Sequence, residues 1–288
     1  MLFLILFLCL LLYIWAVIPN TDRRDKATEF ATVKYAHRGL HSEALPENSL
    51  GAFEAAIEKG YGIELDVRLT KRGELVVFHD DDLKRMCGVD KKVSECTYEE
   101  LLNFRLLNTD YKIPLLSEVL KLVAGRTELL VEIKETGKEI AVSKALIPVL
   151  REYKGKFAVQ SFSPYAVNYI AKNADEMIRG ILVSERGKGS GIKGILLENF
   201  MLNCYHKPDF VSVHHNLYNT SLYIIYKLCR VPAFAWTVRS EEEEKSSETV
   251  FKTVIFENYL PSNERKDFSR SKGMNALKKN KQMKAENK

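Results

Sequence analysis

The sequence predicts a (β/α)8 barrel, also called a TIM barrel, over residues 33–261. Two observations favour this α/β fold. Short β-like runs alternate with amphipathic helical runs, and the segment approaches the length of about 250 residues that such barrels take. A third observation disfavours the rival fold, an open doubly wound sheet, because no helical run is preceded by the G-x-G-x-x-G loop of dinucleotide-binding sheets. We therefore expect a closed parallel sheet with helices outside it.

Nine short apolar runs are the candidate strands. Residues 62–69, GIELDVRL, alternate most clearly, because Ile63, Leu65 and Val67 fall on one face while Glu64 and Asp66 fall on the other. Two carboxylates on a buried face need a compensating positive group. The full set of candidate strands is 33–38, 62–69, 74–80, 127–134, 156–162, 177–183, 209–215, 231–238 and 252–256.

Amphipathic runs at residues 47–60, 117–125, 138–155 and 221–230 are the clearest candidate helices. The first has Asn48 or Ser49 as its N-cap and Gly60 as its stop, and Asn48 is equally suited to a place in a site. Residues 81–113 break the alternation and contain a short helix capped by Thr97. We expect this segment, after the second strand, to be a small insertion folded over the mouth of the barrel.

Residues 1–19 contain no charged side chain. As a helix they would rise about 28 Å, close to the thickness of a bilayer core. A secretory signal peptide is the rival interpretation, but it would need basic residues before the apolar run and a small-residue cleavage site after it. We therefore expect one N-terminal transmembrane helix, joined to the barrel by a linker at residues 20–32.

The charges beside this segment favour a single-pass protein of the cell membrane with a cytoplasmic barrel. Arg23, Arg24 and Lys26 follow the apolar run, and basic residues stay on the cytoplasmic side of a span. The five cysteines have no paired or zinc-like spacing, which is typical of reduced thiols.

The net positive charge of the chain comes from its C-terminal tail. Residues 262–288 carry a net charge of +6, whereas the whole chain carries +5. The tail is either a solvated, frayed end or a segment attracted to anionic lipid headgroups. Its basic residues are not interleaved with aromatic ones, so nucleic acid is not an expected partner.

Polar side chains gather where several predicted strands end. The strand ends of a (β/α)8 barrel converge on one face, where catalytic sites are built. Three carboxylates there, from Glu64, Asp66 and Glu132, are hard oxygen donors suited to one divalent cation, Mg²⁺ or Ca²⁺. The other members of the set are His37, Arg38, His79, Asp80 and Lys134.

This combination is suited to cleavage of a phosphodiester. Arg38 and Lys134 are able to hold an anionic oxygen, and His37 and His79 are able to move protons near neutral pH. We take His37 as the base and His79 as the acid, with the reverse assignment left open. Asp80 is expected to orient a histidine, and Trp236 is either barrel packing or a wall against the substrate.

The ordered set AHRG, PENS, GIELDV, VVFHD, VEIK, SF and WTV resembles the glycerophosphodiester phosphodiesterase family, over about residues 35–261. The resemblance implies a TIM barrel that hydrolyses glycerophosphodiesters to glycerol 3-phosphate and an alcohol. It implies Glu64, Asp66 and Glu132 as metal ligands, His37 and His79 as the acid/base pair, and Arg38 and Lys134 near the phosphate.

Two positions depart from the family pattern. Arg239 follows WTV where the family often has Asn, and the late TD-x-P stretch is FENYLP here, at residues 256–261. Both departures leave substrate preference open. The alternatives are a phosphodiesterase acting on lysophospholipids and a barrel that binds phosphodiesters without cleaving them. An amidohydrolase is disfavoured, since that class uses histidine-rich ligand sets.

Overall fold

The structure is a computed structural model of the whole chain, and it describes residues 1–134, 137–184, 191–217, 222 and 225–262. Eight parallel strands close into a barrel, because the first, β1 (Tyr35–Ala36), pairs with both its neighbour in sequence and the last strand. The other seven are β2 (Gly62–Leu69), β4 (Leu129–Ile133), β5 (Phe157–Ser161), β6 (Arg179–Val183), β7 (Phe210–His214), β8 (Ala233–Val238) and β9 (Thr253–Phe256). The predicted barrel is confirmed.

One predicted strand lies outside the barrel. β3 (Leu75–Val77) runs antiparallel to the C-terminal end of β2, with Val77 opposite Val67 and Leu75 opposite Leu69. The run at 74–80 is therefore the return strand of a hairpin and not a barrel strand. The hairpin returns the chain to the barrel mouth, where Phe78 N donates to Asp66 O.

The insertion that follows β3 has a small apolar core of its own. It contains α4 (Lys84–Cys87), η2 (Val93–Glu95) and α5 (Tyr98–Leu101), the last capped by Thr97 as expected. Phe78, Leu83 and Leu101 are fully or almost fully buried in this cluster. The segment is thus held together by its own packing before the chain re-enters the barrel pattern at α6.

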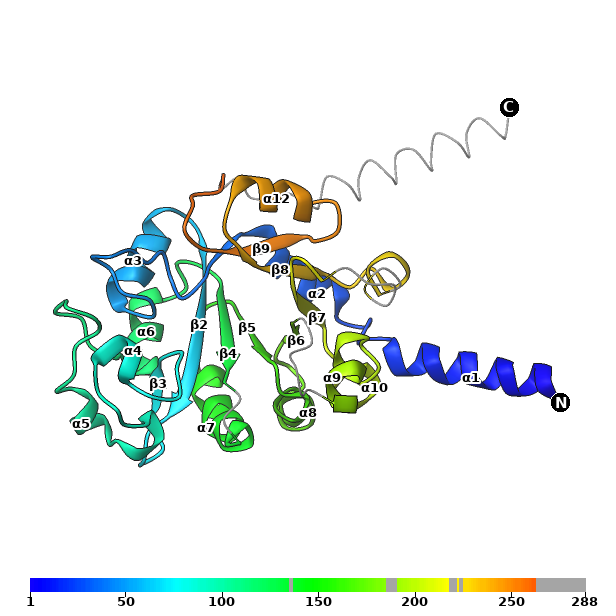
Figure 1. Cartoon of the computed structure of the whole chain (residues 1–288), viewed down its shortest axis with the longest axis horizontal. Helices are drawn as coiled ribbons and strands as arrows, with labels where there is room; N and C mark the ends of the chain where they lie inside the picture. Colours follow the sequence, from blue (N-terminus) through cyan, green and yellow to red (C-terminus); the bar gives the residue numbers. More distant parts are fainter. Residues whose placement is uncertain (135–136, 185–190, 218–221, 223–224, 263–288) are drawn as a thin grey trace.

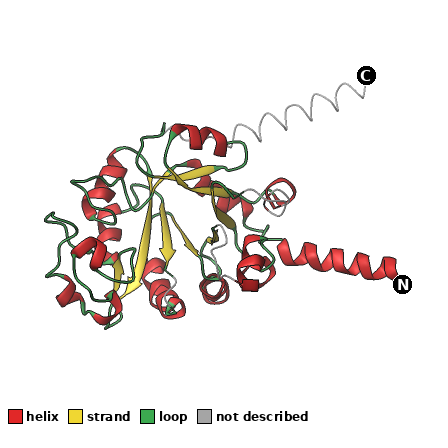
Figure 2. Ribbon diagram, in the orientation of Figure 1, coloured by secondary structure: helices red, strands yellow, loops and turns green. Residues whose placement is uncertain are grey.

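Helices cover the outside of the barrel, as Figure 2 shows. They are α3 (Leu50–Glu58), α6 (Leu116–Val123), α7 (Glu139–Glu152), α8 (Pro164–Asn173), α9 (Gly191–Glu198), α10 (Asn203–His206), η3 (Ile225–Cys229) and α12 (Glu241–Ser247). The outward face of β2, with Ile63, Leu65 and Val67, packs in the main core between sheet and helices. The alternation of β2 leaves Glu64 and Asp66 facing the barrel interior.

Residues 20–32, predicted as a linker, contain α2 (Arg24–Glu29) and the short helix η1 (Phe30–Thr32). Phe30 and Ala31 pack against Tyr35, Phe210 and other residues of the barrel strands. The sequence between 20 and 32 is polar enough to suggest a linker, but its few apolar side chains close one end of the barrel. This end lies opposite the strand ends that carry the polar set.

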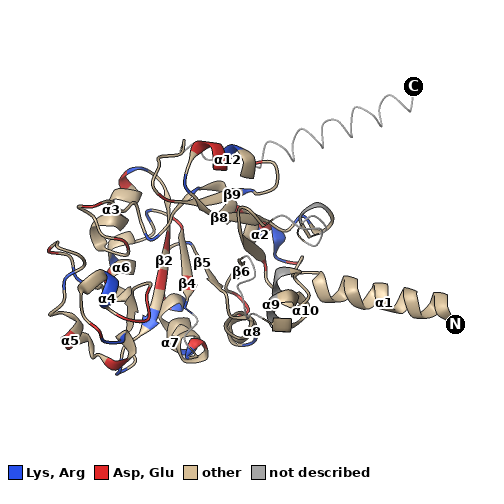
Figure 3. Cartoon of the chain, viewed as in Figure 1, with Lys and Arg blue, Asp and Glu red and all other residues tan. Residues whose placement is uncertain are grey.

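The N-terminal segment forms the helix α1 (Leu2–Val17), which extends away from the barrel beside α10 (Figure 1). It carries no charge along its whole length, as Figure 3 shows. At 16 residues it is shorter than the nineteen expected, and among the described residues no helix has the length and apolar character needed to cross a membrane. The structure therefore does not support the predicted transmembrane span. Nearly all of the predicted basic tail, residues 263–288, lies outside the described residues.

Candidate active site

Three buried carboxylates form the centre of the site. Glu64, Asp66 and Glu132 each offer an oxygen to a group whose atoms all lie within 4.8 Å of one another. None of the three residues is more than 5% exposed. Strand alternation places Glu64 and Asp66 on the same face of β2, and the register of the barrel places Asp66 directly beside Glu132 of β4. The predicted metal ligands are therefore neighbours in space.

Two basic side chains share these carboxylates. Lys134 Nζ lies 3.3 Å from Asp66 Oδ1 and 2.7 Å from Glu132 Oε1, and Arg38 Nε lies 3.5 Å from Asp66 Oδ2. Asp66 Oδ1 and Glu132 Oε1 nevertheless accept no well-aligned hydrogen bond. Buried carboxylate oxygens without such a partner are unusual. The cluster therefore fits a hard divalent cation, for which oxygen ligands are the preferred set.

Burial and the neighbouring charges shift the pKa values of these carboxylates strongly. Burial, followed by the charges of Asp66 and Glu132, raises the pKa of Glu64 well above its usual range. Burial alone would raise the pKa of Asp66 too, but Lys134 and Arg38 outweigh burial and hold that pKa low. Three carboxylates so close together cannot all be ionised without more positive charge than these two side chains supply.

Each predicted catalytic histidine is held by a carboxylate through Nδ1. His37 Nδ1 lies 2.6 Å from Glu257 Oε2, and His79 Nδ1 lies 2.6 Å from Asp80 Oδ1. A carboxylate acceptor keeps the proton on Nδ1 and leaves Nε2 of a neutral ring free for proton transfer. Burial is the largest influence on both histidines and lowers the pKa of each. Asp80 thus lies where the expected orienting role needs it.

Two residues near His37, Arg38 and Asn48, have left-handed backbone conformations and bind the carboxylates. Arg38 adopts a left-handed conformation, with φ 57°, and its N–H donates to Glu64 Oε2 at 3.0 Å. Asn48 is also left-handed and its side-chain amide donates to Asp66 Oδ2 at 2.8 Å. Ser49, not Asn48, caps α3 by accepting from Ala52 N. The structure therefore assigns Asn48 to the site and Ser49 to the cap.

Sequence reasoning missed several members of the site. Glu257 was noted only as part of a departure from the family pattern, and Arg85 lies in the insertion. Arg85 Nε donates to Asp80 Oδ2 at 2.6 Å and also binds Glu47 through two nitrogens, while Arg38 Nη1 donates to Glu47 Oε1. No spacing rule links these positions. The PENS motif, which contains Glu47, was the one available signal.

A hollow of about 160 Å³ opens beside the carboxylates. Trp236 of β8 lines it, with its indole nitrogen donating to Ser212 O and its ring packed edge-on against Phe162, with centroids 5.3 Å apart. One side of the hollow is therefore aromatic and the other is charged. Its lining includes His37, Arg38, Glu64, His79, Glu132, Lys134, Gln160, Phe162, Leu182, Trp236, Thr237 and Arg239.

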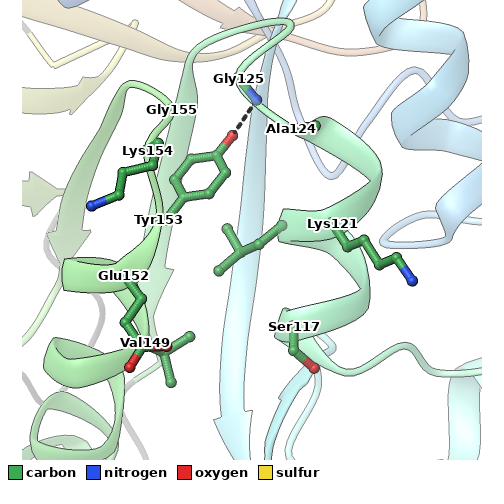
Figure 4. Close-up of a pocket in the computed structure, with 10 residues that line it drawn as sticks. Ser117, Lys121, Ala124, Gly125, Val149, Glu152, Tyr153, Lys154 and Gly155 are labelled. Carbon is green, nitrogen blue, oxygen red and sulfur yellow. Dashed lines mark hydrogen bonds between the residues drawn. The ribbon is translucent and has the colours of Figure 1, made fainter.

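A larger hollow, of about 410 Å³, lies outside the barrel between α6 and α7 (Figure 4). Tyr153 crosses it and accepts a hydrogen bond from Gly125 N at 3.0 Å. Its charged side chains, Lys121, Glu152 and Lys154, form no cluster of carboxylates or histidines. Size therefore does not identify the site here, whereas the arrangement of titratable groups at the barrel mouth does.

Residues 37–259 match the glycerophosphoryl diester phosphodiesterase family. The chain belongs to this family. The matched segment begins at His37 and runs past Glu257, so it includes every residue of the polar set at the barrel mouth. The resemblance stated from the motifs is confirmed at the level of the family.

Individual relatives agree with this assignment. A glycerophosphodiester phosphodiesterase of Caldanaerobacter subterraneus is 35% identical over 52% of this chain and 66% of its own length. A lysophospholipase D of Rattus norvegicus is 32% identical over 47% of this chain and 46% of its own length. The matches thus span less than two thirds of these curated relatives.

The fold has solved counterparts. An Oleispira antarctica phosphodiesterase, solved in complex with the product sn-glycerol-3-phosphate, has a TM-score of 0.68 with this structure. The alignment covers 80% of this chain and 94% of that one at 23% identity. At this identity the likeness shows a common fold, and the chemistry of this chain must be argued from its own residues.

Proposed function

We propose that this protein hydrolyses glycerophosphodiesters to glycerol 3-phosphate and an alcohol. The observation that carries the proposal is the convergence of three buried carboxylates and two carboxylate-held histidines on one hollow. Family membership supports it, since the relative from Caldanaerobacter subterraneus carries the name of this activity.

We further propose that Glu64, Asp66 and Glu132 hold one divalent cation, Mg²⁺ or Ca²⁺. A bound cation of this kind supplies positive charge that neutralises phosphate oxygens and relieves the repulsion among the three carboxylates. Lys134 and Arg38 are placed to hold the non-bridging phosphate oxygens from the same side. Both lie at the rim of the carboxylate cluster and both line the hollow.

The two histidines divide the proton transfers in this proposal. His37, with a neutral ring, accepts a proton at Nε2 from the attacking oxygen nucleophile. His79, with a doubly protonated ring, donates its Nε2 proton to the leaving alkoxide and keeps its Nδ1 proton hydrogen-bonded to Asp80. Their Nδ1 atoms are occupied by Glu257 and Asp80, so each ring presents one defined nitrogen to the hollow. Trp236 forms the aromatic wall against the carbon atoms of the substrate.

A second candidate substrate is a lysophospholipid. The name of the rat relative, lysophospholipase D, favours it, and so does the exposed apolar helix α1. An apolar helix with this exposure would keep the barrel close to lipid. The shared chemistry is a glycerophosphate ester, so the two candidates differ in the acyl chain and not in the reaction.

One experiment separates these functions. The chain is purified in detergent and given glycerophosphocholine, glycerophosphoethanolamine, glycerophosphoinositol and lysophosphatidylcholine, each with and without EDTA. Release of glycerol 3-phosphate supports the first function, and release of lysophosphatidic acid supports the second. Binding of these compounds without cleavage, in the presence of Mg²⁺ or Ca²⁺, would instead support the non-catalytic barrel.

We also propose that α1 attaches the barrel to the cytoplasmic face of the cell membrane. Large apolar side chains are exposed along most of α1, and the five cysteines are free thiols. Arg24 is 39% exposed and lies 3.8 Å from Asp25, so together with Lys26 it is placed to reach anionic lipid, whereas Arg23 is engaged by Asp209 through two nitrogens. The ion pair of Arg23 removes one of the three charges on which the orientation was predicted.

A further inference from the structure

Three strand ends meet at the buried side of His37. His37 follows β1, Glu257 follows β9 and Arg239 follows β8, and these strands are neighbours in the barrel. His37 N donates to Phe256 O, and Glu257 N donates to Val238 O, so the backbone ladder continues into this region. The positions of the three side chains are therefore fixed by the barrel itself.

The side chains form a continuous series of contacts, here called the His37 triad (His37, Glu257 and Arg239). Glu257 Oε2 lies 2.6 Å from His37 Nδ1, and Glu257 Oε1 accepts from Arg239 Nε at 2.7 Å. The side chains of His37 and Glu257 are 14% and 13% exposed, whereas that of Arg239 is 50% exposed. Arg239 thus balances the charge of a largely buried carboxylate from the solvent side.

The other histidine has the same arrangement, built from different elements. His79, Asp80 and Arg85 form a second triad in which Asp80 binds His79 Nδ1 at 2.6 Å and accepts from Arg85 Nε at 2.6 Å. This triad comes from the β3 hairpin and the insertion, and the first comes from the barrel. In both triads the Nδ1 atom of the histidine therefore meets a carboxylate, and an arginine binds that carboxylate in turn.

The His37 triad also joins the two positions at which the sequence departs from the family pattern. Arg239 stands where Asn is common, and Glu257 lies in the segment that replaces TD-x-P. The departures are far apart in sequence, yet their side chains form an ion pair. Both departures therefore belong to one series of contacts, in which Arg239 binds Glu257 and Glu257 binds His37.

We propose that Glu257 is a positioning residue for His37 and that Arg239 acts through Glu257. Glu257 keeps the proton on Nδ1 and fixes the ring plane, so that Nε2 faces the hollow and accepts the proton of the nucleophile. Arg239 fixes the rotamer of Glu257. The inference rests on the proposed function for its kinetic consequence, but the geometry of the ring is independent of turnover.

The rival role for these residues is structural only. Glu257 would then tie the ends of β8 and β9 together, and His41, whose Nε2 lies 3.9 Å from Glu257 Oε2, would serve as well as His37. Glu244 of α12 offers a matched control, because it is also a largely buried carboxylate, it bonds Lys34 and Tyr259, and it contacts neither catalytic histidine.

The test compares Glu257→Gln, Glu257→Asp, Arg239→Met and Glu244→Gln in the full chain. We expect Glu257→Gln to lower kcat about 10- to 100-fold with KM changed less than about 2-fold, the scale seen when a supporting partner of an active-site group is removed. Glu257→Asp should restore most of that loss. Arg239→Met should lower kcat less, and its effect should shrink in the Glu257→Gln background, since coupled residues are not additive.

Two results would overturn the proposal. One is an equal loss of kcat in Glu257→Gln and Glu244→Gln, and the other is a rise in KM with kcat unchanged. NMR of the ¹⁵N-histidine-labelled protein gives a readout without turnover. The downfield Nδ1–H resonance of His37 should be present in the parent and shift or vanish in Glu257→Gln but not in Glu244→Gln. An inactive parent with this resonance would refute the proposed function and leave the positioning role intact.

Discussion

Asp66 and Glu132 are direct neighbours across the pairing of β2 and β4, and Lys134 Nζ lies within 3.3 Å of both carboxylates. Strand pairing holds the two carboxylates together regardless of their repulsion, because the backbone register is fixed by the whole barrel. Lys134 and Arg38 supply two positive charges, whereas Asp66, Glu132 and Glu64 are three neighbouring carboxylates. The arrangement is therefore short of positive charge, which is the basis of the first prediction.

Removal of divalent cations is expected to abolish hydrolysis. EDTA should eliminate product formation, and Mg²⁺ or Ca²⁺ should restore it in the parent chain. Glu64→Gln and Asp66→Asn should prevent this recovery, because each removes an oxygen donor from the cluster. Calorimetric titration of the apo protein with each cation measures binding directly.

Glu54 provides a matched control for these variants. It lies on α3 and pairs with Arg126 at the surface, away from the barrel mouth. Glu54→Gln should keep the activity and cation affinity of the parent. Full activity in EDTA, with no metal found by elemental analysis, would contradict the prediction.

Loss of either histidine is expected to slow the chemical step. His37→Ala and His79→Ala should each lower kcat by roughly 100-fold or more, the usual scale for a general acid or base. Substrate binding should change less, because the proposed phosphate contacts of Arg38 and Lys134 remain in both variants. Steady-state kinetics with the best substrate of the headgroup panel provide both values.

Leaving-group chemistry distinguishes the two histidines. A substrate with a p-nitrophenolate leaving group needs no proton from an acid, so it should rescue His79→Ala and leave His37→Ala slow. Selective rescue of His37→Ala would reverse the assignment of base and acid.

The pH profile of kcat/KM should have its acid limb below pH 6.5. His37 must be neutral to accept a proton, and burial together with the charge of Arg38 outweighs Glu257 and lowers the pKa of His37 below 6.5. Activity is therefore lost as the pH falls through that lowered pKa. An acid limb centred above pH 7 in the parent would show that His37 is not the base.

His206 should make the fold sensitive to acid. It lies buried at the end of α10, and burial lowers its pKa to about 3. The unfolded chain, with a histidine pKa of about 6.5, binds a proton that the folded chain excludes. The free energy of unfolding should thus fall as the pH drops from 6.5 toward 3, by up to about 1.4 kcal/mol per pH unit.

Urea unfolding at several pH values between 5 and 6.5 measures this slope. His206→Gln removes the titrating group, so the variant should show a shallower dependence on pH than the parent, whatever its absolute stability. Identical slopes for the two proteins would mean that His206 is protonated as easily when folded as when unfolded.

The barrel is expected to face the cytoplasm. Protease added to intact cells should leave the barrel uncut, and it should be digested only after lysis. A chain that begins at residue 18 lacks α1 and should move to the soluble fraction. Digestion of the full chain without lysis would place the barrel outside and contradict the role given to Arg24 and Lys26.

The local sequence pattern was sufficient to predict the barrel and the cluster of three carboxylates. The alternation of residues 62–69 determined which side chains share a face, because the period of two is a local property of extended backbone. The order of strands and helices then determined the barrel, since parallel neighbours need helical crossovers. From these two facts Glu64, Asp66 and Glu132 could be placed together without any knowledge of their distances.

The tertiary structure decided what surrounds this cluster. Residues 74–80 look like a barrel strand, and only the pairing of β3 with β2 shows that a hairpin returns His79 to the mouth. Residues 20–32 look like a linker, and only the packing of Phe30 shows that they close the barrel. In both cases the local pattern fits two arrangements, and burial of apolar surface selects between them.

Except for Asp80, the residues that hold the two histidines in place could not be predicted from the sequence. Glu257 is 220 positions from His37, and Arg85 reaches Glu47 from the insertion. A strand pattern specifies the face on which a side chain lies, but not the residue that it meets from another part of the barrel. Closure of the sheet brings β1 beside β9, and that contact, which no local period encodes, gives His37 its carboxylate.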